Sequence, residues 1–163
     1  MAQNYVEQLV SEYYEYQGYF VRRNVQVGPR AKGGYECELD VVAYDPKTNH
    51  LVQVEPSMDA DTWVEREHRY EKKFTAGKKY IPELFQGLTV GAELEQIAIF
   101  IGGHSREDRT LCGGRILYLW EFLRSAIDLI KDKHVLRSAV PEQYPILRTL
   151  QLANNFHDHL FDR

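Results

Sequence analysis

The chain has 163 residues, 44% hydrophobic and 27% charged, with a formal net charge of −4. This length allows one domain with a substantial core and is short for two, so we expect a single domain over residues 1–163. The acidic balance excludes a uniformly basic nucleic-acid coat, although local basic patches can still hold a phosphate backbone.

Nothing in the sequence indicates a membrane or secretory segment. There is no run of about 18 apolar residues, and the polar first residues are unlike a signal peptide. Cys37 and Cys112 form neither a metal-binding C-x-x-C pair nor a disulfide framework, which suits a reducing compartment. We therefore expect a soluble cytoplasmic protein with no membrane contact.

The first elements in chain order are a helix and a strand. Apolar residues at helical spacing predict a helix over residues 5–17, capped by Asn4 and followed by Gly18. Residues 19–27 favour a strand, and the glycine-rich stretch 28–34 favours a turn. Residues 22–34 carry four basic side chains and no acid: Arg22, Arg23, Arg30 and Lys32.

Residues 36–57 carry the most informative pattern. Two β-branched runs around an Asp/Pro/Asn turn at 45–49 predict an antiparallel hairpin. Glu38, Asp40 and Val42 should share one strand face, and Glu55 can become a neighbour of Asp40 across the hairpin. Two adjacent carboxylates repel unless a proton or a cation neutralises them, and Mg²⁺ prefers one or two carboxylates plus waters and phosphate oxygens. The alternative is a solvated carboxylate pair on an exposed sheet face.

The remaining elements alternate between helices and strands. A capping box from Thr62 to Glu65 opens a helix that we expect to end near Gly77. Residues 80–95 predict only a short helical turn around Pro82 and a loop. Strands are predicted at 96–101 and 115–119, an amphipathic helix at 120–131, and a last helix from after Pro141 to near Asn155.

This order of elements, with its carboxylates, resembles the PD-(D/E)XK nuclease superfamily, which includes restriction-endonuclease-like and Holliday-junction-resolvase-like enzymes. The specific part is L-D-V-V-A at residues 39–43 followed by L-V-Q-V-E at residues 51–55. Asp40 and Glu55 match the acidic motif residues, and Glu7 matches a glutamate that many members carry on the first helix. The resemblance covers residues 3–132. It implies an α/β fold with a restriction-endonuclease-like three-layer core, a central mixed β-sheet flanked by helices.

The chain departs from the superfamily at the motif lysine, whose place is taken by Ser57 after Pro56. Some members carry this lysine on the following helix instead. The helical stripe expected to face the sheet consists of Trp63, Glu67, Tyr70 and Phe74. Lys73 lies on the flank of this stripe and is the first candidate, while Lys72 points nearly opposite; the alternative for each is a surface lysine. Glu67, within the stripe, would either pair with an arginine or reach the metal site.

The resemblance implies a Mg²⁺- or Mn²⁺-dependent nuclease that hydrolyses phosphodiester bonds, with DNA as the expected substrate. Asp40, Glu55 and Glu7 would hold the metal, and Lys73 would orient the attacking water. Superfamily members that cut both strands often dimerise, so a homodimer is possible, although no self-complementary patch requires one. Two alternatives remain: a lapsed site in a nucleic-acid-binding or assembly module, marked by Ser57, and an interaction domain with an incidental carboxylate pair.

Two other groups of residues are weaker candidates. The loop from Gly102 to Gly114 carries His104, Arg106 and Arg109, and is either a contact to nucleic-acid backbone or an ordinary hairpin loop. The stretch 157–159 (His-Asp-His) has metal-capable groups but is more typical of a frayed polar tail.

Overall fold

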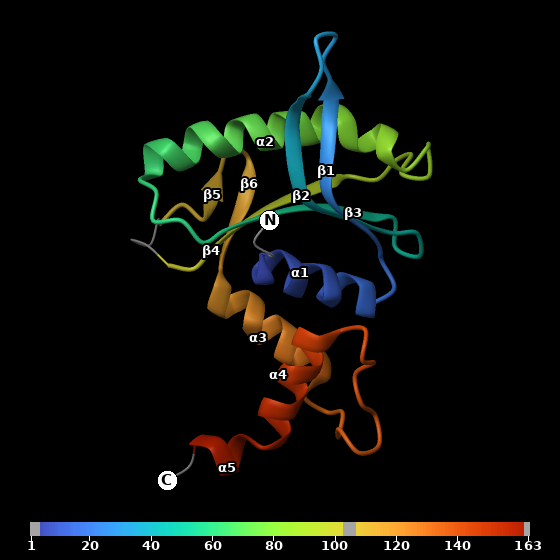
Figure 1. Ribbon diagram of the computed structural model, residues 1–163, viewed down its shortest axis with the longest axis vertical. Coiled ribbons are helices and arrows are strands. Elements are labelled where there is room, and N and C mark those ends of the chain that lie inside the picture. The colour runs from blue at the N-terminus through green and yellow to red at the C-terminus, as the bar shows by residue number, and fades with distance from the viewer. Residues whose placement is uncertain (1–3, 103–106, 162–163) are drawn as a thin grey trace.

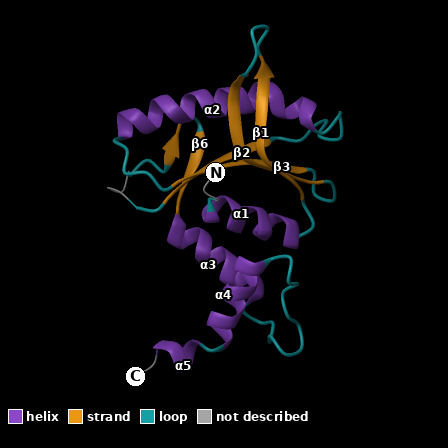
Figure 2. Cartoon of the chain, viewed as in Figure 1, coloured by secondary structure: helices purple, strands orange, loops and turns teal. Residues whose placement is uncertain are grey.

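A six-stranded mixed β-sheet separates two layers of helices in the computed structural model, which describes residues 4–102 and 107–161. Figures 1 and 2 show helix α2 on one face of the sheet and helices α1, α3 and α4 on the other. The prediction of an α/β fold with a central mixed sheet flanked by helices is thereby confirmed. Among the described residues, no helix combines the length and apolar character needed to cross a membrane.

The elements follow one another as helix, three strands, helix, three strands and three helices. Their bounds are α1 Tyr5–Tyr16, β1 Phe20–Pro29, β2 Tyr35–Asp45, β3 His50–Ser57, α2 Trp63–Leu84, β4 Leu94–Phe100, β5 Thr110–Leu111, β6 Gly114–Tyr118, α3 Leu119–Ile130, α4 Pro145–Asn155 and α5 His157–Phe161. The strand order across the sheet is β1-β2-β3-β4-β6-β5. Strands β1, β2 and β3 are antiparallel, whereas β4 pairs in parallel with both β3 and β6.

Strand alternation divides the core between the two faces of the sheet. On the α1 face, Val41, Val52 and Val54 pack into a cluster with residues of α1, α3 and β4. On the α2 face, Val42 and Leu51 pack with residues from the C-terminal half of α2. The middle of the sheet is therefore buried on both sides, which explains the nearly continuous apolar runs in β2 and β3.

The hairpin formed by β1 and β2 bends at Asp40. Leu39 and Val42 pack into the same cluster on the α2 face, whereas strict alternation would place them on opposite faces. In the β1–β2 register, the residue opposite Asp40 is Asn24, whose φ of +49° lies in the left-handed region. The outer half of the hairpin leaves the sheet here and extends past α2 (Figure 1). The predicted shared face of Glu38, Asp40 and Val42 is interrupted at the bend, and Glu38 is exposed.

Helix α2 begins with the predicted capping box but does not end near Gly77, as the sequence suggested. It continues to Leu84 and includes Pro82 in its last turn. Gly77 marks a close approach to the sheet, because a Cβ at this position would lie 1.8 Å from the Gln53 Oε1 atom. A glycine within a helix costs about 1 kcal/mol relative to alanine, and here it allows the helix to lie directly on the polar side chain of β3.

The buried stripe of α2 contains Arg66 where the sequence suggested Glu67. Arg66 is 4% exposed and its guanidinium stacks on the rings of Phe100 and Trp63, at 4.3 and 4.9 Å from the ring centroids. It also donates to the backbone oxygen of Asp59. Glu67 is only half-buried. Tyr70 and Phe74 face the sheet as predicted.

Candidate functional site

Asp40 and Glu55 lie where β2 and β3 separate. The backbone ladder between these strands runs as far as the Val41–Val54 pair, so the next residues in register are Asp40 and Glu55. The Asp40 backbone N–H donates to both oxygens of the Glu55 carboxylate, at 3.3 and 3.4 Å. The bend of β2 thus leaves the Asp40 N–H without a strand partner, and the Glu55 carboxylate accepts its hydrogen bond.

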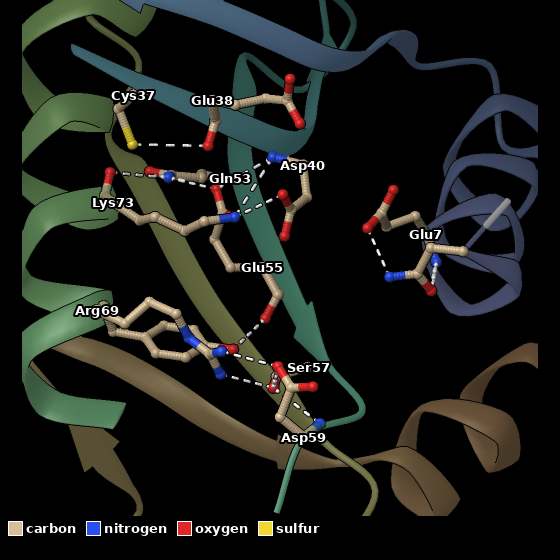
Figure 3. A network of polar contacts seen from close by, with 12 residues as sticks. Glu7, Cys37, Glu38, Asp40, Gln53, Glu55, Ser57, Asp59, Arg69 and Lys73 are labelled. Carbon is tan, nitrogen blue, oxygen red and sulfur yellow. Dashed lines mark hydrogen bonds and ion pairs between the residues drawn. The ribbon is translucent and has the colours of Figure 1, made fainter. Parts of the chain in front are cut away.

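Lys73 joins the two carboxylates from helix α2. Its Nζ atom lies 2.5 Å from Asp40 Oδ1 and 2.5 Å from Glu55 Oε2. Because both oxygens contact the same nitrogen, they lie no more than about 5 Å apart. Figure 3 shows the three side chains meeting between the helix and the two strands. The predicted approach of Asp40, Glu55 and Lys73 is confirmed as geometry, and Lys72 is exposed, as its helical direction indicated.

The electrostatics of this triad follow from burial. Glu55 is fully buried, and desolvation raises its pKa to about 8, with the Lys73 ammonium opposing the rise and the Asp40 carboxylate adding to it. Burial is the largest single influence on Lys73 and lowers its pKa, but the attractions and hydrogen bonds of Glu55 and Asp40 together outweigh it, so the pKa of the ammonium is raised. Lys73 therefore stays charged at neutral pH, while burial favours the protonated form of Glu55.

Two buried glutamines support the triad, and sequence reasoning missed them. Gln53 Nε2 donates to Glu55 Oε1 at 2.8 Å and to the Lys73 backbone oxygen at 3.1 Å. Gln96 Nε2 in turn donates to Gln53 Oε1 at 2.7 Å, and the Tyr70 hydroxyl donates to the Glu55 backbone oxygen at 2.8 Å. The available signal was a glutamine among the apolar residues of each of two strands, because a buried amide must find hydrogen-bond partners.

A cavity of about 240 Å³ opens beside the triad. Its wall includes residues of α1, β2, β3 and α2, namely Asn4, Glu7, Asp40, Pro56, Ser57, Met58, Asp59, Arg69, Tyr70 and Lys73. Glu55 does not belong to this wall.

Glu7 faces the triad from α1, on the opposite side of the view in Figure 3. Burial raises the pKa of its carboxyl, and the nearby Asp40 carboxylate raises it further. The Asn4 side chain donates to Glu7 at 2.5 Å. Across residues 4–102 and 107–161, no three His, Cys, Asp or Glu side chains gather closely enough to hold one metal ion. Glu7 therefore shares the cavity with Asp40, and its role as a ligand stays a prediction.

Ser57 stands where the superfamily motif would have lysine, and a second cation of α2 reaches it. Arg69 Nη2 donates to Ser57 Oγ at 2.7 Å, while Arg69 Nη1 lies 2.8 Å from Asp59 Oδ2 and 2.9 Å from Asp61 Oδ2. Arg69 and Lys73 are one helical turn apart and both line the cavity. Ser57, at the position where the resemblance expects a lysine, is thus contacted by Arg69, while Lys73 reaches Asp40 and Glu55 from the next turn of the same helix.

The residues present fit a divalent cation. Asp40 and Glu55 already converge on one cation, the Lys73 ammonium, and two carboxylates with waters are a sufficient protein contribution for Mg²⁺. The raised pKa of Glu55 indicates that the ammonium alone does not offset the cost of burying this charge.

The weaker candidates that the structure describes do not join this site. His157 and His159 lie on the short, exposed helix α5. Arg109 pairs with Glu121 and stacks on Tyr118, while His104 and Arg106 lie outside the described residues.

No protein-family model, no curated protein and no solved structure matches this chain. Its function must therefore be inferred from its own residues.

Proposed function

We propose that the protein is a metal-dependent nuclease that hydrolyses phosphodiester bonds in DNA, with a restriction-endonuclease-like core. The observation that carries the proposal is the convergence of Asp40 and Glu55 on the ammonium of Lys73 beside an open cavity. The order of helix, three antiparallel strands, helix and parallel strand supports the same fold. The two carboxylates come from two neighbouring strands, as the superfamily motif expects, and the lysine, which the motif places two residues after the glutamate, comes from helix α2 instead; this arrangement supports the proposal.

Asp40 and Glu55 would hold the metal, with Glu7 across the cavity as a further carboxylate. A bound Mg²⁺ or Mn²⁺ supplies Lewis-acid activation of a water and offsets the charge that grows on the phosphate. Lys73 is a donor only, so its part is to orient the attacking water or to stabilise the charged phosphate oxygens. Gln53 fixes the Glu55 carboxylate through Oε1, which leaves Oε2 directed toward the ammonium.

A second candidate is a nucleic-acid-binding module with a lapsed site. The observation that favours it is the closure of the triad: Lys73 contacts both carboxylates, and Glu55 is buried behind the cavity wall. A metal must therefore compete with the ammonium for the same carboxylate oxygens. In a lapsed site the metal would not displace the ammonium from the carboxylates, and the triad would only stabilise the fold.

Cleavage assays separate the two candidates. Supercoiled plasmid, linear duplex and single-stranded DNA are incubated with the protein in Mg²⁺, Mn²⁺ or EDTA. The nuclease proposal expects metal-dependent cleavage that Asp40→Asn abolishes and Lys73→Ala lowers by roughly 10²–10³-fold, the usual cost of one preorganised charge. Lys72→Ala is the matched control, since Lys72 is exposed on the neighbouring position. Linearised rather than nicked plasmid would indicate paired sites in a homodimer.

Absence of cleavage in both metals, together with retained binding of DNA, would favour the lapsed module. Cleavage that persists in Asp40→Asn would contradict the proposed site.

A further inference from the structure

Two cationic side chains line the cavity among the described residues. Lys73 bridges Asp40 and Glu55, and Arg69 has other partners. It lies one turn before Lys73 on α2, with 34% of its side chain exposed. Its guanidinium makes three contacts, to Ser57, Asp59 and Asp61. Two of these partners belong to the loop that follows β3, and the third is the last residue of that strand.

The charges around the cavity leave a role for this guanidinium. With a divalent cation bound and the carboxylates ionised, the three negative charges of Glu7, Asp40 and Glu55 are balanced by the cation and the Lys73 ammonium. A phosphodiester that enters the cavity adds a further negative charge. Among the described residues that line the cavity, the other cationic side chain is Arg69. Its planar fork is suited to phosphate oxygens.

The present partners of Arg69 differ in how firmly they are held. Ser57 is 7% exposed and its hydroxyl also accepts from the Asp59 backbone N–H, so it is a fixed neighbour. The Asp59 side chain is 61% exposed, and such an exposed ion pair contributes little free energy. A phosphate can therefore take the place of the Asp59 carboxylate at small cost, while Ser57 and the less exposed Asp61 carboxylate, 30% exposed, keep the guanidinium in position.

We propose that Arg69, held by Ser57, is a binding subsite for a backbone phosphate of the nucleic-acid substrate, and that Asp59 occupies it until the substrate displaces it. This inference rests on the proposed nuclease function. The competing explanation is a purely structural clamp, in which Arg69 only fastens the loop after β3 to helix α2.

Binding of fluorescein-labelled single-stranded and duplex oligonucleotides in EDTA tests the subsite without cleavage. Fluorescence anisotropy is measured from about 50 to 200 mM salt, because each lost phosphate contact lowers the slope of log K against log salt concentration by about 0.7–0.9. Arg69→Gln should weaken binding roughly tenfold and lower this slope by about one contact. Arg69→Lys should retain the slope and part of the affinity. Arg115→Gln is the matched control, since Arg115 is 53% exposed and is also paired with a carboxylate, that of Glu95 at 2.8 Å.

Asp59→Asn supplies a change in the opposite direction, which a folding defect cannot imitate. It should tighten binding several-fold in the wild-type background and by a smaller factor when Arg69 is already glutamine. A gain of equal size in both backgrounds would overturn the displacement, because it would reflect only the removal of a repulsive charge. Equal affinities and slopes for Arg69→Gln and Arg115→Gln would overturn the subsite.

A parallel cleavage assay in Mg²⁺ distinguishes failure of the Arg69 subsite from failure of the proposed nuclease function. Metal-dependent cleavage by the wild type, with Arg69→Gln unchanged in binding and in kcat/KM, would overturn the subsite alone. A wild type that neither binds nor cleaves any of these nucleic acids would overturn both proposals.

Discussion

Replacing Lys73 with methionine should destabilise the protein in a pH-dependent way. Methionine keeps most of the lysine stem and removes the ammonium, so Asp40 and Glu55 face each other without the cation that bridges them. Glu55 is fully buried, and the loss of an opposing charge leaves its ionised form with only the Gln53 amide and the Asp40 backbone N–H as partners.

The magnitude follows from the burial of the pair. Removing one partner of a buried ion pair costs roughly 3–5 kcal/mol, and the 20% exposure of the Lys73 side chain lowers this expectation to roughly 2–4 kcal/mol. Lys72→Met is the control, because an exposed substitution on the same helix should stay within about 0.5 kcal/mol of the wild type.

The sign of the pH dependence follows from the pKa of Glu55. This pKa is about 8 in the folded protein against an ordinary value of 4.5, so the folded state binds more protons than the unfolded state between these values. The contribution of Glu55 to stability therefore falls as pH rises through this window. The Lys73 ammonium lowers the Glu55 pKa, so its removal widens the window. Well below pH 8 Glu55 is protonated in both proteins, so the penalty of Lys73→Met should be smallest near pH 6 and should grow as pH rises through 8 toward 9.5, where the wild type ionises Glu55 and the variant resists doing so.

Urea denaturation at both pH values measures these differences. A penalty of the same size at pH 6 and pH 9.5 would refute the assignment of the effect to Glu55. Equal stabilities of Lys73→Met and Lys72→Met at pH 9.5 would refute the triad itself.

Two further substitutions test the metal site and its support. Mg²⁺ or Mn²⁺ at about 100 times its Kd should add about 2.7 kcal/mol and raise the Tm by roughly 5–10 °C. Asp40→Asn should remove most of this rise, and identical melts of the wild type with and without metal would contradict a metal site. Gly77→Ala should cost roughly 1–3 kcal/mol, measured by urea denaturation, because the added Cβ meets Gln53 Oε1 at 1.8 Å. Thr75→Ala, at an exposed position of the same helix, should be neutral or slightly stabilising; an equal loss in both variants would show that the contact with Gln53 is unimportant.

The parts of the site that depend on local periodicity could be predicted from sequence. Turn residues between two β-branched runs indicated the β2–β3 hairpin, and strand alternation placed Asp40 opposite Glu55. Counting 100° per residue along α2 separated Lys73 from Lys72, because the direction of a helical side chain depends only on its own helix.

The parts that depend on contacts between elements could not be predicted in this way. Gly77 fits a helix end or a close approach equally well, and only the position of Gln53 on β3 decides between them. The exchange of Glu67 for Arg66 in the stripe follows from the aromatic rings that Arg66 meets on its own helix and on β4. The bend at Asp40, which opens its backbone N–H to Glu55, involves the left-handed conformation of Asn24 on the neighbouring strand.

Arg69 and Lys73, the two cationic side chains of the cavity wall, come from helix α2 and not from a strand, and this affects how the sequence of such a site can vary. When an ammonium is supplied by a helix that crosses the acid pair, the strand beneath no longer needs to encode it, and Ser57 can vary without removing charge from the cavity. Successive turns of one helix offer interchangeable places from which a long side chain reaches the same point. Under the proposed function, a linear motif reads Ser57 as a missing cation, whereas in three dimensions the Lys73 ammonium from the neighbouring helix contacts both carboxylates.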